Sequence, residues 1–125
     1  MLLEKSLSRA LAGTGAALDF SGIWKNELGS KMTLSQKNDV LSGTYESAVS
    51  AGGQPTSGDL QGYVDGNLIA FVVHWKQFQA ITAWVGQTNP KNSKQISTLW
   101  QMTSKVGAGE EWASINAGAD YFTKQ

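Results

Sequence analysis

The sequence predicts an all-β domain, an eight-stranded antiparallel up-and-down β-barrel. From residue 20 onward, short runs of alternating apolar and polar residues follow one another, and no helical period of about a dozen residues recurs. The fourteen glycines and two prolines supply turns between these runs. A closed barrel leaves no sheet edge exposed and suits eight consecutive strands with short connections. A β-sandwich is the alternative architecture.

Turn residues separate the eight predicted strands. The strongest turn signal is Asp65-Gly66-Asn67, because these residue types tolerate the positive φ angles of two-residue hairpin turns. The last loop, at 104–111, has room for a helical turn. The predicted strands cover residues 20–28, 31–36, 40–49, 57–64, 68–75, 80–87, 94–103 and 112–124.

Residues 1–19 are predicted to form a disordered or weakly helical leader ahead of a barrel domain at 20–125. Leu2, Leu3, Leu7 and Leu11 follow a roughly helical spacing, but charged residues stand between them. A secretory signal needs an unbroken apolar run of about 7–15 residues, so we do not assign one. The alternatives are a remnant of a processed segment and a docking helix for a partner. No run reaches the roughly 18 apolar residues of a membrane span.

Composition excludes several classes of protein. The chain has 125 residues, which is the size of one domain, with ten basic and ten acidic residues. This balance predicts neither a nucleic-acid partner nor a membrane partner. Without cysteine there is no disulfide and no thiol nucleophile, and a single histidine leaves few metal ligands. We therefore expect no metal and no cofactor.

The five tryptophans are the unusual part of the composition. Core packing is their simplest role, but their strand faces also carry polar residues. Asn26 shares a face with Trp24, Thr82 shares a face with Trp84, and Asp120 lies inside the last strand. The same alternation gives the fifth and seventh predicted strands one inward face each, formed by Phe71, Val73 and Trp75 and by Ile96, Thr98, Trp100 and Met102. Buried polar groups that stay unpaired cost a few kcal/mol. Several of them in one barrel therefore favour a pocket for a polar ligand.

The sixth predicted strand is apolar on both faces. Thr82 and Trp84 alternate with Ile81, Ala83 and Val85. A small barrel has only one interior, so the second apolar face predicts burial against another subunit.

Four runs of residues carry a family resemblance. Residues 22–30 (GIWKNELGS), 41–49 (LSGTYESAV), 84–87 (WVGQ) and 120–124 (DYFTK) resemble the avidin and streptavidin family, in order and spacing, over about 20–124. The resemblance implies an avidin-like barrel that binds and sequesters biotin in its open end with high affinity and no catalysis. It also implies a homo-oligomer, a tetramer built as a dimer of dimers, and a secreted or periplasmic location.

The resemblance assigns the polar residues to parts of biotin. Asn26, Ser30 and Tyr45 match donors to the ureido oxygen, and all three side chains can donate hydrogen bonds. Ser47 and Asp120 match acceptors for the two ureido N–H groups, where a carboxylate would supply a charge-assisted bond.

The remaining assignments surround the ring system and the tail of biotin. Thr82 matches the contact to the thioether sulfur, and Met102 stands where the family often has Leu. The resemblance also includes Val49 in the site. The enclosing rings are assigned to Trp75, Trp84 and Trp100, with Trp112 contributed by a neighbouring subunit.

The tail end departs from the family pattern. Ala80 stands where streptavidin has a serine that binds the biotin carboxylate, and Ala51 falls near a position whose backbone N–H meets the same group. We expect the ureido end to be kept and the carboxylate end to be weaker. Tail-modified biotin should then lose little affinity relative to free biotin.

Other functions explain the residues less well. Ser47, His74 and Asp120 are the residue types of a hydrolase triad, but His74 falls on the strand face opposite Trp75, and no Gly-x-Ser-x-Gly turn is present. We therefore expect no enzyme activity. A lipocalin-like carrier of another small ligand and a sugar-binding lectin remain alternatives.

Overall fold

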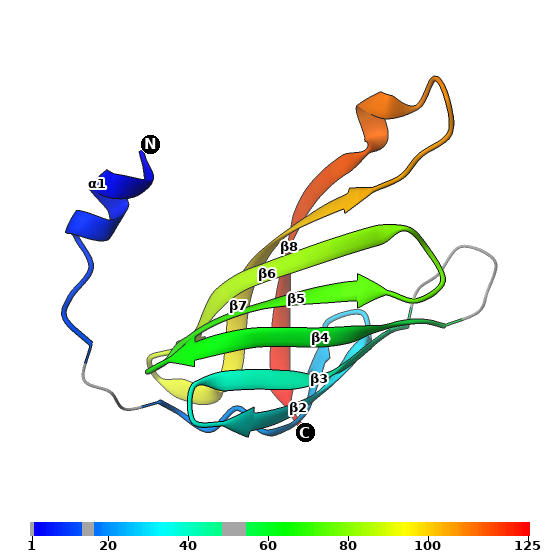
Figure 1. The fold of residues 1–125 in the computed structure, drawn as a ribbon. Coiled ribbons are helices and arrows are strands. Elements are labelled where there is room, and N and C mark those ends of the chain that lie inside the picture. Colours follow the sequence, from blue (N-terminus) through cyan, green and yellow to red (C-terminus); the bar gives the residue numbers. More distant parts are fainter. Residues whose placement is uncertain (1, 14–16, 49–54) are drawn as a thin grey trace.

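Eight antiparallel strands close into one barrel in the computed structural model, which describes residues 2–13, 17–48 and 55–125 (Figure 1). Each strand pairs with the next, and β1 pairs with β8 to complete the circle. This confirms the predicted fold class. The strands are β1 (Gly22–Asn26), β2 (Lys31–Lys37), β3 (Val40–Ser47), β4 (Thr56–Asp65), β5 (Leu68–Trp75), β6 (Ala80–Asn89), β7 (Asn92–Ser104) and β8 (Ile115–Lys124).

The first strand is shorter than predicted, and Phe20 lies outside it. Asp19 accepts a hydrogen bond from the Ser21 N–H at 2.9 Å, and Gly22 has φ +122°, so the chain turns before β1 begins. Phe20 is only 1% exposed. Its carbonyl oxygen accepts a bond from Trp24 Nε1 at 2.8 Å. Phe20 therefore belongs to the core although it is not a strand residue.

The last strand begins at Ile115, so the predicted start at 112 is wrong. A 3₁₀ helix, η1 (Glu111–Ala113), occupies that position. The Ala113 N–H donates to the Glu110 carbonyl at 2.8 Å, and the Ser114 N–H donates to the Glu111 carbonyl at 3.1 Å. The predicted helical turn thus exists, but it lies at the end of the 104–111 loop. In Figure 1 this turn projects beyond the barrel wall.

The hairpin between β6 and β7 is tighter than predicted. β6 continues to Asn89 and β7 starts at Asn92, with a register shift at Thr88/Asn89. Side-chain caps stabilise the turn, since Asn89 Oδ1 accepts the Lys91 N–H at 2.9 Å and Asn92 Oδ1 accepts the Lys94 N–H at 3.0 Å. The two asparagine side chains thus satisfy backbone N–H groups of the short turn.

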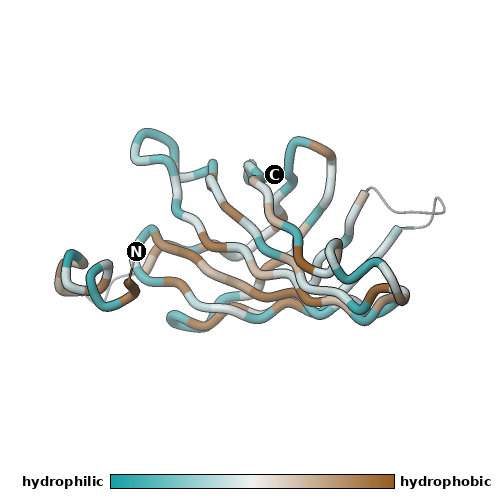
Figure 2. The backbone as a smooth tube through the Cα atoms, turned by 90° about the horizontal axis from the view of Figure 1, so that it is seen from above, coloured by the Kyte–Doolittle hydropathy of each residue, from teal (hydrophilic) through white to brown (hydrophobic). Residues whose placement is uncertain are grey.

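Alternate residues of the strands fill the barrel with side chains. Along β5 the pattern places Phe71 and Val73 inside and Val72 and His74 outside, as predicted. Figure 2 shows hydrophobic and hydrophilic residues following one another along the strands. The core is formed mainly by Phe20, Trp24, Met32, Leu34, Leu41, Tyr45, Leu60, Val64, Ile69, Phe71, Val73, Trp84, Ile96 and Phe122.

The N-terminal residues include one short helix, α1 (Leu3–Ser8), which buries none of its residues. Residue Ala17 forms a parallel bridge with Gly66, and the Leu18 N–H donates to the Gly66 carbonyl at 3.0 Å. These bonds attach the chain just before Phe20 to the turn between β4 and β5. Among the described residues, no helix has the length and apolar character needed to cross a membrane.

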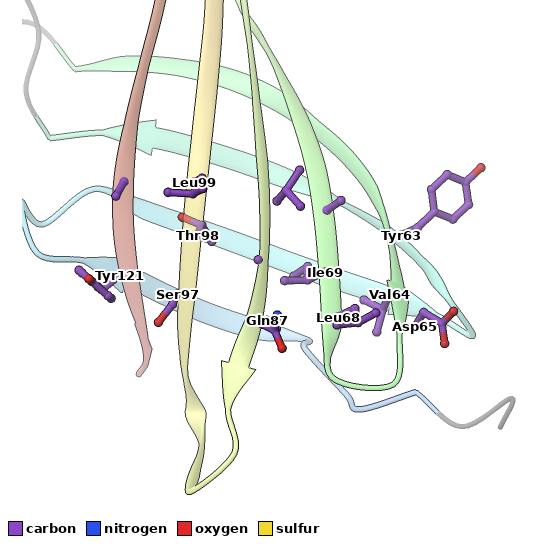
Figure 3. Close-up of a pocket in the computed structure, with 14 residues that line it drawn as sticks. Tyr63, Val64, Asp65, Leu68, Ile69, Gln87, Ser97, Thr98, Leu99 and Tyr121 are labelled. Carbon is purple, nitrogen blue, oxygen red and sulfur yellow. The ribbon is translucent and has the colours of Figure 1, made fainter. Parts of the chain in front are cut away.

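The outer wall carries an apolar hollow of about 640 Å³. Its lining comes from β4 to β8, as Figure 3 shows. Leu99 is 70% exposed and Val85 is 64% exposed. Within one chain, the inner face of β6 is buried and its outer face is exposed to solvent. The predicted burial of the outer face would need another subunit.

Candidate functional site

Four polar side chains meet at one end of the barrel, and we call them the polar cluster: Asn26, Ser30, Tyr45 and Asp120. Asn26 ends β1, and its Oδ1 accepts N–H groups from Leu28 at 3.0 Å and from Ser30 at 2.9 Å. These two bonds orient the amide, so its Nδ2 faces the Tyr45 hydroxyl at 3.4 Å. The turn after β1 thus fixes which end of Asn26 is presented to the cluster.

Ser30 and Tyr45 are both buried in the cluster. Ser30 Oγ accepts the Ala48 N–H at 3.1 Å, and the Ser30 side chain is hydrogen-bonded to Tyr45. Burial, followed by the negative charge of Asp120, raises the pKa of Tyr45 well above its usual value. The phenol therefore keeps its proton and remains a hydrogen-bond donor at all physiological pH values.

Asp120 is 8% exposed and contributes the cluster's carboxyl group from β8. Its Oδ2 accepts a bond from Trp84 Nε1 at 2.8 Å. Its backbone carbonyl accepts the Thr98 hydroxyl at 3.0 Å. Burial raises the pKa of Asp120 to about 6, with a further increase from Glu27, while hydrogen bonds from Trp84 and Asn26 oppose the rise.

Aromatic rings border the polar cluster. The Tyr45 and Trp84 rings stack with centroids 4.8 Å apart, and Phe71 stacks on Trp84 at 5.1 Å. Trp75 meets the Tyr45 ring edge-on at 5.5 Å, and its Nε1 donates to Thr82 Oγ1 at 2.9 Å. Such a site combines apolar ring faces with a few directed polar groups, as small-molecule sites usually do.

Trp100 and Met102 lie on β7 and share the inward face as predicted, both partly buried. The Trp100 ring lies over Gly118 of β8, where an added Cβ atom would stand 2.5 Å from the ring. Gly118 therefore permits the position of the Trp100 ring.

The polar groups satisfy one another in the folded chain. In residues 2–13, 17–48 and 55–125, no buried side-chain nitrogen or oxygen lacks a hydrogen-bond partner. The buried polar groups that led us to expect a polar ligand therefore already have partners within the protein. A ligand would have to replace some of these hydrogen bonds with its own.

One predicted site residue, Trp112, lies away from the cluster. Val49 and Ala51 lie outside the described residues. Trp112 lies in η1 and is 85% exposed, which separates it from the buried rings. Ser47 ends β3, two residues after Tyr45, and is partly buried.

The predicted position of His74 is confirmed. It is exposed on the outer face of β5. Asp120 is buried and belongs to the cluster at the barrel end. The residues of a hydrolase triad are therefore on different sides of the barrel wall.

Sequence reasoning missed Glu27, Phe71 as a stacking partner, and Gly118. The Tyr121 N–H donates to Glu27 Oε2 at 3.0 Å, and Glu27 is hydrogen-bonded to the Asp120 side chain. The strand alternation predicted that Phe71 faces inward, but it did not indicate which ring Phe71 contacts. No local pattern pairs Glu27 with a residue about 90 positions away.

Comparison with known proteins assigns the family. The sequence pattern that defines the avidin family matches residues 14–125. The chain belongs to the avidin family. Avidin from Gallus gallus is 31% identical to this avidin-family chain over 143 residues, covering 99% of the chain and 91% of avidin. Avidin-related protein 1 from the same organism is 30% identical, covering 100% of the chain and 92% of that protein.

Solved avidin-like structures agree with the fold of this family member. Xenavidin superposes with a TM-score of 0.70 at 28% identity, covering 88% of the chain and all of xenavidin. The bradavidin2–biotin complex gives a TM-score of 0.71 at 28% identity, covering 86% of the chain and 99% of bradavidin2. Bradavidin2 is thus a biotin-bound example of this barrel.

Proposed function

We propose that this chain binds and sequesters biotin in the open end of the barrel, without catalysis. The observation that carries the proposal is the polar cluster of Asn26, Ser30, Tyr45 and Asp120 beside stacked aromatic rings. A cyclic urea has one strongly accepting oxygen and two N–H donors. The cluster offers three donors and a carboxyl acceptor, which matches that polarity.

The proposed residue roles come from the family resemblance, and the orientation of Asn26 and Asp120 in the cluster supports them. Asn26 Nδ2 and the hydroxyl protons of Ser30 and Tyr45 donate to the ureido oxygen. Asp120 accepts one ureido N–H while Trp84 Nε1 holds its Oδ2. Ser47 accepts the second N–H.

The rings and the remaining predicted residues enclose the rest of biotin. Thr82 contacts the thioether, and its hydroxyl oxygen is already held by Trp75. The tail leaves past Ala80, whose methyl group cannot donate to the carboxylate. The enclosing set is proposed to be Val49, Ala51, Trp75, Trp84, Trp100 and Met102, with Trp112 from a neighbouring subunit.

We also propose that the protein is a homotetramer. The apolar hollow on the outer wall gives a second copy a surface to cover, and Leu99 and Val85 are its most exposed aliphatic residues. Trp112, exposed in the single chain, is then available to a neighbouring site. The family resemblance further supports a secreted or periplasmic location.

Calorimetric titration of ligand-free protein with biotin tests the proposed function. We expect one site per chain and an affinity that Asp120→Ala lowers by roughly tenfold or more, because a charge-assisted bond contributes about 1.5–3 kcal/mol. Asp59→Ala is the matched control, since Asp59 is exposed on β4 and forms a surface ion pair with Lys76 at 3.6 Å. The amide of biotin should bind almost as well as biotin itself.

Absence of both heat and a thermal shift with biotin would contradict the proposal. The lipocalin-like carrier and the lectin would then be the functions to test next, with fatty acids and simple sugars as probes. Equal weakening by Asp59→Ala and Asp120→Ala would contradict the assigned role of Asp120.

A further inference from the structure

Barrel closure brings two acidic side chains together. β1 ends with Asn26 opposite Phe122 of β8, so Glu27 follows beside Tyr121. The Tyr121 N–H donates to Glu27 Oε2 at 3.0 Å. The carboxyl group of Glu27 is also hydrogen-bonded to that of Asp120, which precedes Tyr121 in β8.

A hydrogen bond between two carboxyl groups requires a proton. Ionised carboxylates only accept, so two of them repel, and one must be protonated for the bond to exist. Glu27 is exposed to solvent, whereas Asp120 is 8% exposed. Partial burial opposes the ionisation of Glu27, but N–H donors of Tyr121 and of Glu27 itself and the bond to Asp120 lower its pKa overall. Asp120 is therefore the group that takes the proton.

The groups that the described residues place around Asp120 supply no compensating positive charge. From β6, Trp84 donates a neutral N–H, and from the end of β1, Asn26 donates a neutral amide. Tyr45 of β3 faces the same carboxyl group and stays neutral. Within the part of the chain that the structure describes, Glu27 is the charged group acting on Asp120.

We propose that Glu27 is a positioning residue that shares a proton with Asp120 in weakly acidic solution, so that ligand is held tightly at neutral pH and more weakly as that proton is taken up. This inference rests on the proposed function, because it treats Asp120 as the acceptor for a ureido N–H. It assigns a role to Glu27, which is not among the predicted site residues, and it gives a pH range over which the affinity for the ligand changes.

The direction of the pH effect follows from linkage. In the ligand-free protein the pKa of Asp120 is raised to about 6, and its ordinary value is 3.8. A bound N–H donor favours the ionised carboxylate, so the complex has a lower pKa than the free protein. Protons and ligand then compete, and the dissociation constant rises as pH falls below about 6. One proton limits the change to about tenfold per pH unit.

The test compares the pH profile of wild type with those of Glu27→Gln and Glu46→Gln. The ligand is biotinamide, whose tail has no carboxyl group to titrate. The Glu27→Gln side chain keeps an acceptor for the Tyr121 N–H but places a neutral amide beside Asp120. We expect Glu27→Gln to match wild type at pH 8 and to bind several-fold to tenfold more tightly than wild type at pH 5. Glu46 is exposed on β3, so Glu46→Gln controls for the change in net charge.

A second measurement does not depend on the ligand. The carboxyl carbon of Asp120, followed by NMR in ligand-free protein, should titrate near pH 6 in wild type and clearly lower in Glu27→Gln. Parallel affinity profiles for wild type and Glu27→Gln, or an unchanged Asp120 titration, would overturn the inference. Failure of biotinamide to bind at pH 8 would instead overturn the proposed function, and the NMR titration would still decide whether Glu27 controls Asp120.

Discussion

Individual residues in the polar cluster owe their orientation to bonds made outside it. Asn26 points its Nδ2 toward Tyr45 because its Oδ1 is held by two backbone N–H groups of the following turn. Ser30 is held by the Ala48 N–H in the same way. Donors that are oriented before a ligand arrives lose little entropy when it binds. The turn after β1 is therefore part of the proposed binding chemistry.

Ala80 offers a test at the scale of one hydroxyl group. Ala80 is buried at the start of β6 on the same face as Thr82. We expect Ala80→Ser to tighten biotin binding about two- to tenfold, because a typical hydrogen bond contributes about 0.5–1.5 kcal/mol. Biotinamide, which has no carboxylate, should gain less.

Dissociation rates for the two ligands measure this difference. Ala83→Ser is the control, since Ala83 lies on the opposite face of β6. An equal gain for biotin and biotinamide would show that the new hydroxyl group does not meet the carboxylate.

At the scale of elements, the site depends on how closely β7 and β8 approach. Trp100 pairs with Gly118 across these strands, and its ring covers the place of a missing side chain. The contacts of the Trp75 and Trp84 rings run through β3, β5 and β6. Neighbouring strands thus supply the ring faces, and a small residue at one position sets where a ring can lie.

Gly118→Ala should displace the Trp100 ring. The added methyl group would stand 2.5 Å from a ring carbon, which is too close for both to keep their places. We expect the variant to lose about 1–3 kcal/mol of stability and to release biotin faster than wild type.

Thermal unfolding and biotin dissociation measure these two effects. Gly107→Ala is the control, because its nearest neighbour, Glu110 Oε2, would be 4.0 Å from the added carbon. If Gly118→Ala unfolded at the wild-type temperature, the close contact would not constrain the ring.

For the whole molecule, closure of the barrel decides which residues meet. Pairing of β1 with β8 sets Glu27 beside Tyr121 and Asn26 near Asp120. Closure also leaves one outer wall with apolar residues from β4 to β8 around a hollow (Figure 3). We propose that the inside and the outside of these strands serve two different purposes, ligand binding and association.

Val85→Asp tests association at this scale. Val85 is 64% exposed in the hollow, and a charge buried between two barrels would be costly. We expect the wild-type chain to have a mass in solution that is a multiple of 13.4 kDa, and the variant to form smaller species.

Light scattering after size-exclusion chromatography measures these masses. Val40→Asp is the control, because Val40 is exposed on β3 and does not line the hollow. A monomeric wild type, or an equal effect of both variants, would contradict association through the hollow.

The sequence by itself determined the barrel class, most strand positions and the inward faces of β5 and β7. These depend on the two-residue period of a strand and on turn residues, which are local properties. Resemblance of four short runs then indicated Asn26, Ser30, Tyr45 and Asp120. The resemblance also implied that these residues meet at the open end of the barrel, and the structure supplied the hydrogen bonds that orient them.

Only the tertiary structure decided where Phe20, Trp24 and Glu27 act. Phe20 lies outside the strand because the chain turns between Asp19 and Ser21, yet it is buried with Trp24 in the core. Glu27 meets Asp120 because the first and last strands pair to close the barrel. Local sequence patterns do not predict such contacts, because the interacting groups become neighbours only after the chain has folded.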